Sequence, residues 1–163
     1  MPEIAVRSAT TEDDEAIWSI LEPVIRAGET YTLPRTLDRQ SALAWWLMGT
    51  HKVFVAEIAG QVVGTYFICA NQLGGGAHVA NCGYITSIVS VGRGIARAMC
   101  AHSLEYGKTQ GFLAMQFNFV VSTNDRAIRL WKSFGFETVG RLPKAFAHPL
   151  HGLIDALVMY RFL

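Results

Sequence analysis

Apolar residues recur along the chain with two different spacings, which predict an alternation of strands and helices. Runs of strand length, continuous or alternating, cover residues 4–7, 53–59, 62–70, 78–86, 113–121, 136–142 and 153–162. Apolar residues three to four positions apart indicate helices over about 10–27, 36–46, 96–106 and 124–134. This order predicts an α/β (α+β) fold, in which helices cover both faces of a mixed central sheet of about seven strands.

Polar residues before the helical segments indicate where the helices begin. Thr10 and Thr11, each with an aspartate three positions later, form two overlapping capping boxes for the first helix. Thr36 is expected to cap the second helix, because its hydroxyl can accept a hydrogen bond from a free backbone N–H group. Ser122 or Asn124 is expected to do the same for the last helix.

Length and composition limit the number of domains and the classes of binding partner. At 163 residues the chain is expected to fold as a single domain over residues 1–163. A formal net charge of +1 argues against nucleic acid and against a membrane surface as partners. Hydrophobic residues make up 51% of the chain, and charged residues make up 17%, whereas the usual charged share is ~25%. This excess of apolar residues predicts a subunit interface, such as that of a homodimer.

The cysteines and histidines give no metal-ligand pattern. The three cysteines have no metal-ligand spacing, and His148 and His151 share a loop without further ligands, so no metal is expected. The odd number of cysteines and an N-terminus without a signal pattern predict a reducing, cytoplasmic location.

Two glycines precede the third helix, directly after a predicted strand, in the segment Ser90-Val91-Gly92-Arg93-Gly94-Ile95-Ala96-Arg97. The start of a helix has unpaired N–H groups and the positive end of the helix dipole, and glycine lets a phosphate approach the backbone. Arg93 and Arg97 add cationic donors. The third small residue of a dinucleotide loop and the Gly-Lys-Ser/Thr ending of a P-loop are both absent. The pattern predicts a phosphate site, the alternative being a plain glycine turn before an ordinary helix.

The segment Val91-Gly92-Arg93-Gly94-Ile95-Ala96 resembles the pyrophosphate loop of the GNAT acyl-CoA N-acyltransferases, whose motif is Gln/Arg-x-x-Gly-x-Gly/Ala. Gly94 and Ala96 fit the motif, whereas Val91 stands at the Gln/Arg position and removes one side-chain contact to phosphate. A second segment, Asn124-x-x-Ala127-x-x-Leu130-Trp131-x-x-x-Gly135-Phe136, resembles the family's Asn-x-x-Ala-x-x-Leu-Tyr-x-x-x-Gly-Phe motif beside the CoA arm. With the order of elements, the resemblance covers essentially the whole chain and implies the GNAT fold and acetyl-CoA as co-substrate.

The resemblance also implies which residues bind acetyl-CoA. Main-chain groups of Tyr84, Ile85 and Thr86 are expected to pair with the pantetheine amides, and N–H groups near Ile85 and Thr86 to polarise the thioester oxygen. Asn124 is expected both to cap its helix and to bond the pantetheine arm. Trp131 replaces the family's tyrosine; its indole supplies no acid, and it is also expected to pack in the core. The residues expected at the pyrophosphate are Gly92, Arg93, Gly94, Ile95, Ala96 and Arg97.

No residue is identified from the sequence as the general base that must deprotonate an amine. Glu29, His78 and Asp155 are candidates at loops or strand ends near the expected acceptor side, and each has a structural role as its alternative. Either deprotonation through water or attack by the small fraction of free amine in solution is therefore expected. Cys82 adjoins the CoA strand without a His or Asn arrangement for a covalent thioester, so direct transfer is favoured.

These features predict an enzyme that transfers acetyl from acetyl-CoA directly to a primary amine of a small, amino-acid-like molecule. Acetylation of a protein N-terminus or of a lysine side chain is the alternative within the family. The departures at Val91 and Trp131 leave open a catalytically silent acyl-CoA-binding module. Residues 28–35 and 141–152 are predicted acceptor loops, and they carry no pattern that names the amine.

Overall fold

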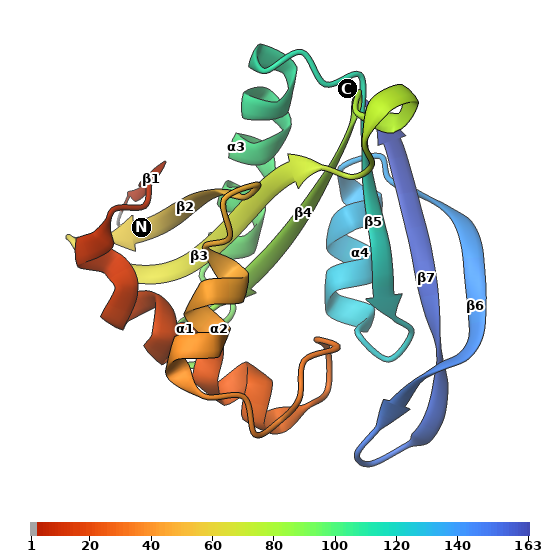
Figure 1. Cartoon of the computed structure of the whole chain (residues 1–163), viewed down its shortest axis with the longest axis horizontal. Helices are drawn as coiled ribbons and strands as arrows, with labels where there is room; N and C mark the ends of the chain where they lie inside the picture. The colour runs from red at the N-terminus through yellow and green to blue at the C-terminus, as the bar shows by residue number, and fades with distance from the viewer. Residues whose placement is uncertain (1–2) are drawn as a thin grey trace.

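The computed structural model describes residues 3–163, which build a seven-stranded sheet in the order β1-β2-β3-β4-β5-β7-β6 (Figure 1). All neighbouring strands are antiparallel except β4 and β5. The strands are β1 (Ile4–Ser8), β2 (Lys52–Ile58), β3 (Gln61–Ala70), β4 (Val79–Thr86), β5 (Ala114–Val121), β6 (Glu137–His148) and β7 (Gly152–Phe162). The helices are α1 (Asp14–Ala27), α2 (Arg39–Trp46), α3 (Ile95–Thr109) and α4 (Asp125–Ser133).

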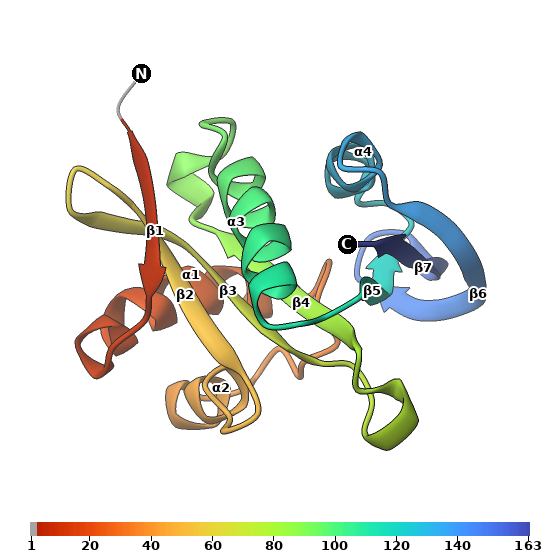
Figure 2. The same ribbon diagram turned by 90° about the horizontal axis from the view of Figure 1, so that it is seen from above.

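Each face of the sheet has its own apolar core. Helices α1 and α2 cover one face, and α3 and α4 cover the other (Figure 2). Ile17 of α1 and Trp46 of α2 belong to the first core, and Met99 of α3 and Trp131 of α4 belong to the second. The predicted mixed sheet with helices on both faces is therefore confirmed. No helix within residues 3–163 combines the length and the hydropathy that crossing a membrane requires.

The predicted side-chain cap is present at α4, whereas the predicted capping box closes the short 3₁₀ turn before α1, and α1 itself has no side-chain cap. Of the two overlapping boxes, the one formed by Thr10 and Asp13 is present, with the Thr10 N–H donating to Asp13 Oδ2 at 2.7 Å. A short 3₁₀ turn, Thr11–Asp13, precedes α1. Of the two predicted caps of α4, Asn124 is the one used, since its Oδ1 accepts from the Ala127 N–H at 3.3 Å. Asn124 is thereby held in a fixed orientation at the start of α4.

The prediction that Thr36 caps α2 was wrong, because Asp38 does so. Asp38 Oδ1 accepts a hydrogen bond from the Ser41 N–H at 2.8 Å. The N–H of Leu37 donates to the carbonyl of Pro34 at 2.9 Å, so the chain is still in a turn at Thr36. An aspartate carboxylate is at least as good a helix cap as a threonine hydroxyl, and here it lies one residue before the helix.

The predicted loop at residues 141–152 was also mostly wrong, because β6 continues to His148 and pairs with β7 as a long hairpin. The pairing is interrupted by a bulge that contains Lys144, a residue with a positive φ of 49°. Asp155 of β7 stabilises this bulge, since its carboxylate accepts from the Lys144 N–H at 2.8 Å and from the Arg141 guanidinium. A contact across the hairpin thus keeps the irregular segment in the sheet.

Candidate functional site

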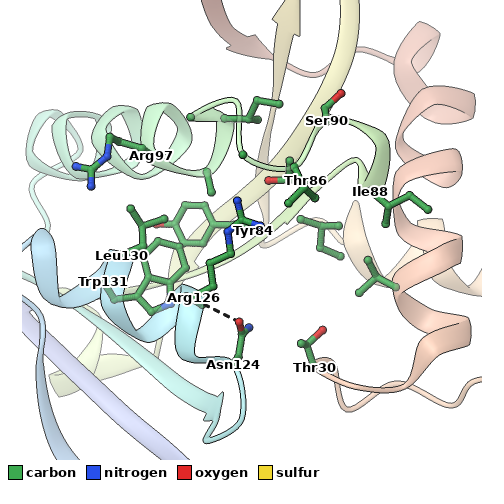
Figure 3. Close-up of a pocket in the computed structure, with 18 of the residues that line it drawn as sticks. Thr30, Tyr84, Thr86, Ile88, Ser90, Arg97, Asn124, Arg126, Leu130 and Trp131 are labelled. Atoms are coloured by element: carbon green, nitrogen blue, oxygen red, sulfur yellow. Dashed lines mark hydrogen bonds between the residues drawn. The ribbon is translucent and has the colours of Figure 1, made fainter.

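Strands β4 and β5 separate soon after they begin. The pairing between them joins Val79 to Ala114 and Ala80 to Met115, whereas β4 remains paired with β3 as far as Thr86. A cavity of about 650 Å³ lies along the separated part of β4, lined also by the start of α3 and by α4 (Figure 3). The edge of β4 in this cavity carries main-chain groups without a strand partner, so it can pair with an extended ligand.

Main-chain groups alternate between the two edges of β4. The N–H of Ser87 donates to β3 at 2.8 Å, whereas the carbonyl of Tyr84 lies on the opposite edge and accepts from the Tyr31 hydroxyl at 3.1 Å. By this alternation Tyr84 and Thr86 direct their main-chain groups to the cavity, and Ile85 directs its groups to β3. All three residues line the cavity, but Tyr84 and Thr86 are the ones that offer it backbone hydrogen bonds.

The glycine turn closes one end of the cavity with free backbone donors. Gly92 and Gly94 have φ values of +89° and +81°, a left-handed conformation that favours glycine. The first backbone bond of α3 joins the Ala98 N–H to the Gly94 carbonyl at 3.0 Å, so the N–H groups before Ala98 have no helical partner. These groups and the helix dipole form an anion site. The lining residues that build it are Gly92, Gly94, Ile95, Ala96 and Arg97.

Arginines surround this turn, in a different arrangement from the predicted one. Arg97 lines the cavity, but its guanidinium turns to α4 and donates to Ser133 Oγ at 3.2 Å. Arg93 is exposed and is not among the lining residues. Arg126 and Arg129 of α4 line the opposite wall, and the sequence reasoning did not single them out. Their spacing of three residues, on the helix that Asn124 caps, is a signal that could have placed them on one face.

An aromatic layer forms the inner wall of the cavity. Trp131 is 8% exposed, and its ring lies 4.9 Å from that of Tyr84 and 5.0 Å from that of Phe117, so the prediction of a packed core residue is confirmed. The Tyr84 hydroxyl pairs with Ser103 Oγ at 2.7 Å, and burial raises the pKa of this phenol. The Trp131 indole is no useful acid, and the Tyr84 phenol keeps its proton, so neither ring supplies a proton to the cavity.

A second cavity, of about 260 Å³, adjoins the first. Its lining comes from the segment after α1, from the start of α4 and from the turn between β6 and β7. Thr30 and Asn124 line both cavities. Within residues 3–163, Glu29 is the only carboxylate that lines either one. The complete lining is Glu29, Thr30, Thr123, Asn124, His148, Leu150 and His151.

Two imidazoles face this second cavity. His148 is 8% exposed, and its Nδ1 accepts a hydrogen bond from the Leu150 N–H at 3.1 Å. In the neutral ring this bond places the proton on Nε2. The ring of His151 lies 4.5 Å from that of His148. The sequence reasoning considered this pair only as metal ligands, because the long hairpin that carries them to the cavity was not predicted.

The other two candidate bases lie elsewhere. His78 is exposed just before β4, where its carbonyl accepts from the Leu113 N–H at 2.9 Å, and it lines neither cavity. Asp155 also lines neither cavity, because its carboxylate holds the β6 bulge. The hydrogen bond from the Lys144 N–H and the bond from Arg141 lower the pKa of Asp155. Of the three candidates, only Glu29 is brought to a cavity.

Covalent catalysis by Cys82 is disfavoured. Cys82 is buried on β4, and its burial raises the pKa of the thiol, which disfavours the thiolate that a covalent thioester requires. In the part of the chain that the structure describes, no three His, Cys, Asp or Glu side chains form a group that could hold a metal ion.

Comparison with known proteins connects this geometry to a family. The model of the acetyltransferase (GNAT) family matches residues 15–136. N-acetyltransferase aca1 of Schizosaccharomyces pombe is 31% identical over 103 residues, which are 62% of this chain and 49% of that protein. The chain thus spans about half the length of this curated relative.

Solved structures share the fold over nearly the full length. A GCN5-related N-acetyltransferase from Kribbella flavida is 37% identical, with a TM-score of 0.94 over 98% of each chain. A phosphinothricin acetyltransferase from Sinorhizobium meliloti, solved in complex with AcCoA, is 19% identical, with a TM-score of 0.85 over 98% of this chain and 88% of its own. Since the family model spans the separated strands, the glycine turn and α4, the chain belongs to the acetyltransferase (GNAT) family.

Proposed function

We propose that the protein transfers the acetyl group of acetyl-CoA directly to the primary amine of a small, amino-acid-like molecule. The observation that carries this proposal is the junction of the two cavities at Thr30 and Asn124. The larger cavity combines a free strand edge with an anion site, whereas the smaller one combines a carboxylate with two imidazoles. One cavity thus suits a thioester with a long polar arm, and the other suits an amine.

The residues of the larger cavity fit acetyl-CoA. A Cβ placed on Gly94 would have Ile4 Cδ1 as its nearest neighbour, at 4.0 Å, so the space beside the first turn of α3 is open to a phosphate. The free N–H groups of that turn would hold the pyrophosphate. The edge of β4 that faces the larger cavity would pair with the pantetheine amides through main-chain groups of Tyr84 and Thr86. Bound there, acetyl-CoA supplies a thioester carbonyl that an amine can attack.

The chain's own groups would assist this attack by hydrogen bonding. A main-chain N–H of Tyr84 or Thr86 would polarise the thioester oxygen, in place of the N–H of Ile85, which is directed to β3. The Trp131 indole can donate a hydrogen bond but no proton. The leaving thiolate, whose parent thiol has a pKa of roughly 8.5, would therefore take its proton from water.

The smaller cavity supports an acceptor that carries both charges of an amino acid. Glu29 would hold the ammonium form of the acceptor, because it is the one carboxylate lining this cavity in the described chain. The N–H donors of His148 and His151 would bind a carboxylate on the same molecule. The ammonium would lose its proton through water before it attacks, with Glu29 and the two imidazoles engaged by the charges of the acceptor.

Release of CoA, followed with a thiol reagent over a panel of amines and corrected for hydrolysis, tests the proposal. We expect turnover with small amino-acid-like amines, and we expect Glu29→Gln to raise the KM for the amine but not the KM for acetyl-CoA. Turnover with peptides alone would instead support acetylation of a protein N-terminus or lysine. Tight binding of acetyl-CoA without turnover on any amine would support the silent module. The cytoplasmic location and the homodimer stay predictions.

A further inference from the structure

The glycine turn has no side-chain cation of its own directed at the anion site. Val91 occupies the position where the motif has Gln or Arg; its side chain is 51% exposed, lines the larger cavity and cannot donate a hydrogen bond. Arg97 is engaged by Ser133, and Arg93 does not line the cavity. An anion at this turn would therefore meet main-chain N–H groups on the α3 side, with the Arg97 guanidinium turned towards Ser133.

Arg126 reaches the same place from the opposite wall. Its side chain extends from α4 into the cavity (Figure 3). Its Nη2 atom is 3.5 Å from the position that a Cβ would take on Gly92. The guanidinium thus lies directly over the glycine turn, within reach of a group bound to the first N–H groups of α3.

The guanidinium of Arg126 also has no counter-ion within residues 3–163. Arg7, Arg39 and Arg141 show the alternative, because each forms an ion pair with a carboxylate. The side chain of Arg126 takes part in no such pair and in no hydrogen bond in this part of the chain. A cation held without a partner beside free N–H donors attracts an anion, and a guanidinium binds two phosphate oxygens with its planar fork.

We propose that Arg126 binds the pyrophosphate of acetyl-CoA and replaces the contact that Val91 does not make. This inference rests on the proposed acetyl-CoA site. The anion is then held between two helices, by the N–H groups of the first turn of α3 on one side and by a side chain of α4 on the other. Binding of the co-substrate thereby links the two helices across the cavity.

Calorimetric titration with three ligands tests the role of Arg126. In Arg126→Ala, the affinity for acetyl-CoA should fall by about 10- to 100-fold, as for loss of a charge-assisted hydrogen bond. The affinity for dephospho-CoA should fall by the same factor, because this ligand keeps the pyrophosphate. The affinity for S-acetylpantetheine, which lacks the pyrophosphate, should not change.

Two further variants supply the matched control and the rescue. Lys132→Ala removes the same charge from α4 at an exposed residue that does not line the cavity, and it should leave all three affinities within about twofold. Val91→Arg, introduced into Arg126→Ala, should recover most of the lost affinity for acetyl-CoA. The single variant Val91→Arg, which keeps Arg126, should gain less affinity for acetyl-CoA, because both side chains would bind the same anion.

Several outcomes would overturn the assignment. The first is an unchanged affinity for acetyl-CoA in Arg126→Ala, and the second is an equal loss of affinity for S-acetylpantetheine. The third is a loss of affinity for acetyl-CoA but not for dephospho-CoA, because that result would assign Arg126 to the 3′-phosphate. If the unmodified protein does not bind acetyl-CoA at all, the proposed function fails together with this inference. Binding by the unmodified protein without an effect of Arg126→Ala contradicts the inference alone.

Discussion

The hydroxyl of Tyr31 donates a hydrogen bond to the main-chain oxygen of Tyr84, with 3.1 Å between the two oxygen atoms. Tyr31 belongs to the segment between α1 and α2 that carries Glu29. The main-chain oxygen of Tyr84 lies on the edge of β4 that faces the larger cavity. Burial raises the pKa of Tyr31, so its phenol keeps the proton that it donates. The bond therefore fixes the segment that lines the smaller cavity to the strand that lines the larger one.

Tyr31→Phe should lower the free energy of unfolding by about 1 kcal/mol, because it removes this hydrogen bond and keeps the ring. It should also raise the KM for the amine more than the KM for acetyl-CoA, since the acceptor segment loses its anchor. Urea denaturation and initial rates measure the two effects. Tyr160→Phe is the matched control, because the Tyr160 hydroxyl has no hydrogen bond in the described part of the chain. Equal stability and equal KM values in both variants would contradict the anchoring role.

Trp131→Ala should destabilise the fold by about 3–5 kcal/mol, because the indole is packed between Tyr84 and Phe117 in the core. Trp131→Tyr should keep the fold and raise turnover, because a phenol can act as the acid that protonates the leaving thiolate. Phe162→Ala is the control, because it also removes a large aromatic side chain but at a residue that is 76% exposed. Chemical denaturation should show a small effect for that control. A Trp131→Ala protein as stable as the unmodified one would show that the packing contributes little.

Features that depend on neighbouring residues could be predicted from the sequence. The glycine turn, the start of α3 and the cap of α4 follow from residues within a few positions of Gly94 and Asn124, and the structure has them where expected. The presence of helices on both faces of the central sheet follows from the spacing of apolar residues. The cap of α2 was missed because Thr36 and Asp38 both suit the role, and the choice depends on how the preceding turn is formed.

The smaller cavity could not be predicted, because it depends on contacts between distant residues. His148 and His151 are carried to it by the β6–β7 hairpin, whose bulge is stabilised by Asp155 across the sheet. Nothing near Lys144 in the sequence indicates that its N–H would find that carboxylate. In the same way, Arg126 meets Gly92 across the cavity, over a separation of 34 positions along the chain that no local pattern covers.

The rate of acetyl transfer should rise from about pH 7 to about pH 9, as the acceptor ammonium loses its proton. Alanine substitutions of Glu29, His78 and Asp155 should each leave substantial kcat, with Glu29→Ala acting on the KM for the amine. Full pH profiles of kcat and kcat/KM for the three variants check this. A loss of about three orders of magnitude in kcat for one folded variant, with acetyl-CoA binding intact, would identify that residue as the base and contradict deprotonation through water.

Acid should weaken the fold through Asp13. The hydrogen bond from Arg7, aided by that from the Thr10 N–H, lowers the pKa of Asp13 from 3.8 to about 2. Because the folded state favours the ionised carboxylate, its contribution is present above about pH 4 and is lost as the pH falls towards about 2. Asp13→Asn should be less stable at neutral pH and should lose less stability over that interval. Unfolding free energies from pH 2 to 7 test this, with the exposed Glu12→Gln as control. Identical slopes for the protein and Asp13→Asn would contradict the linkage.

The central claim is that acetyl-CoA binds with its pyrophosphate at the start of α3, and calorimetry on two glycine variants tests it most directly. Gly94 and Gly60 have similar φ values, +81° and +77°, so valine strains the backbone at both, but of the two only Gly94 lines the cavity. Gly94→Val should lose at least about tenfold in affinity for acetyl-CoA, whereas Gly60→Val should bind as the unmodified protein does. A folded Gly94→Val protein with unchanged affinity would contradict the claim.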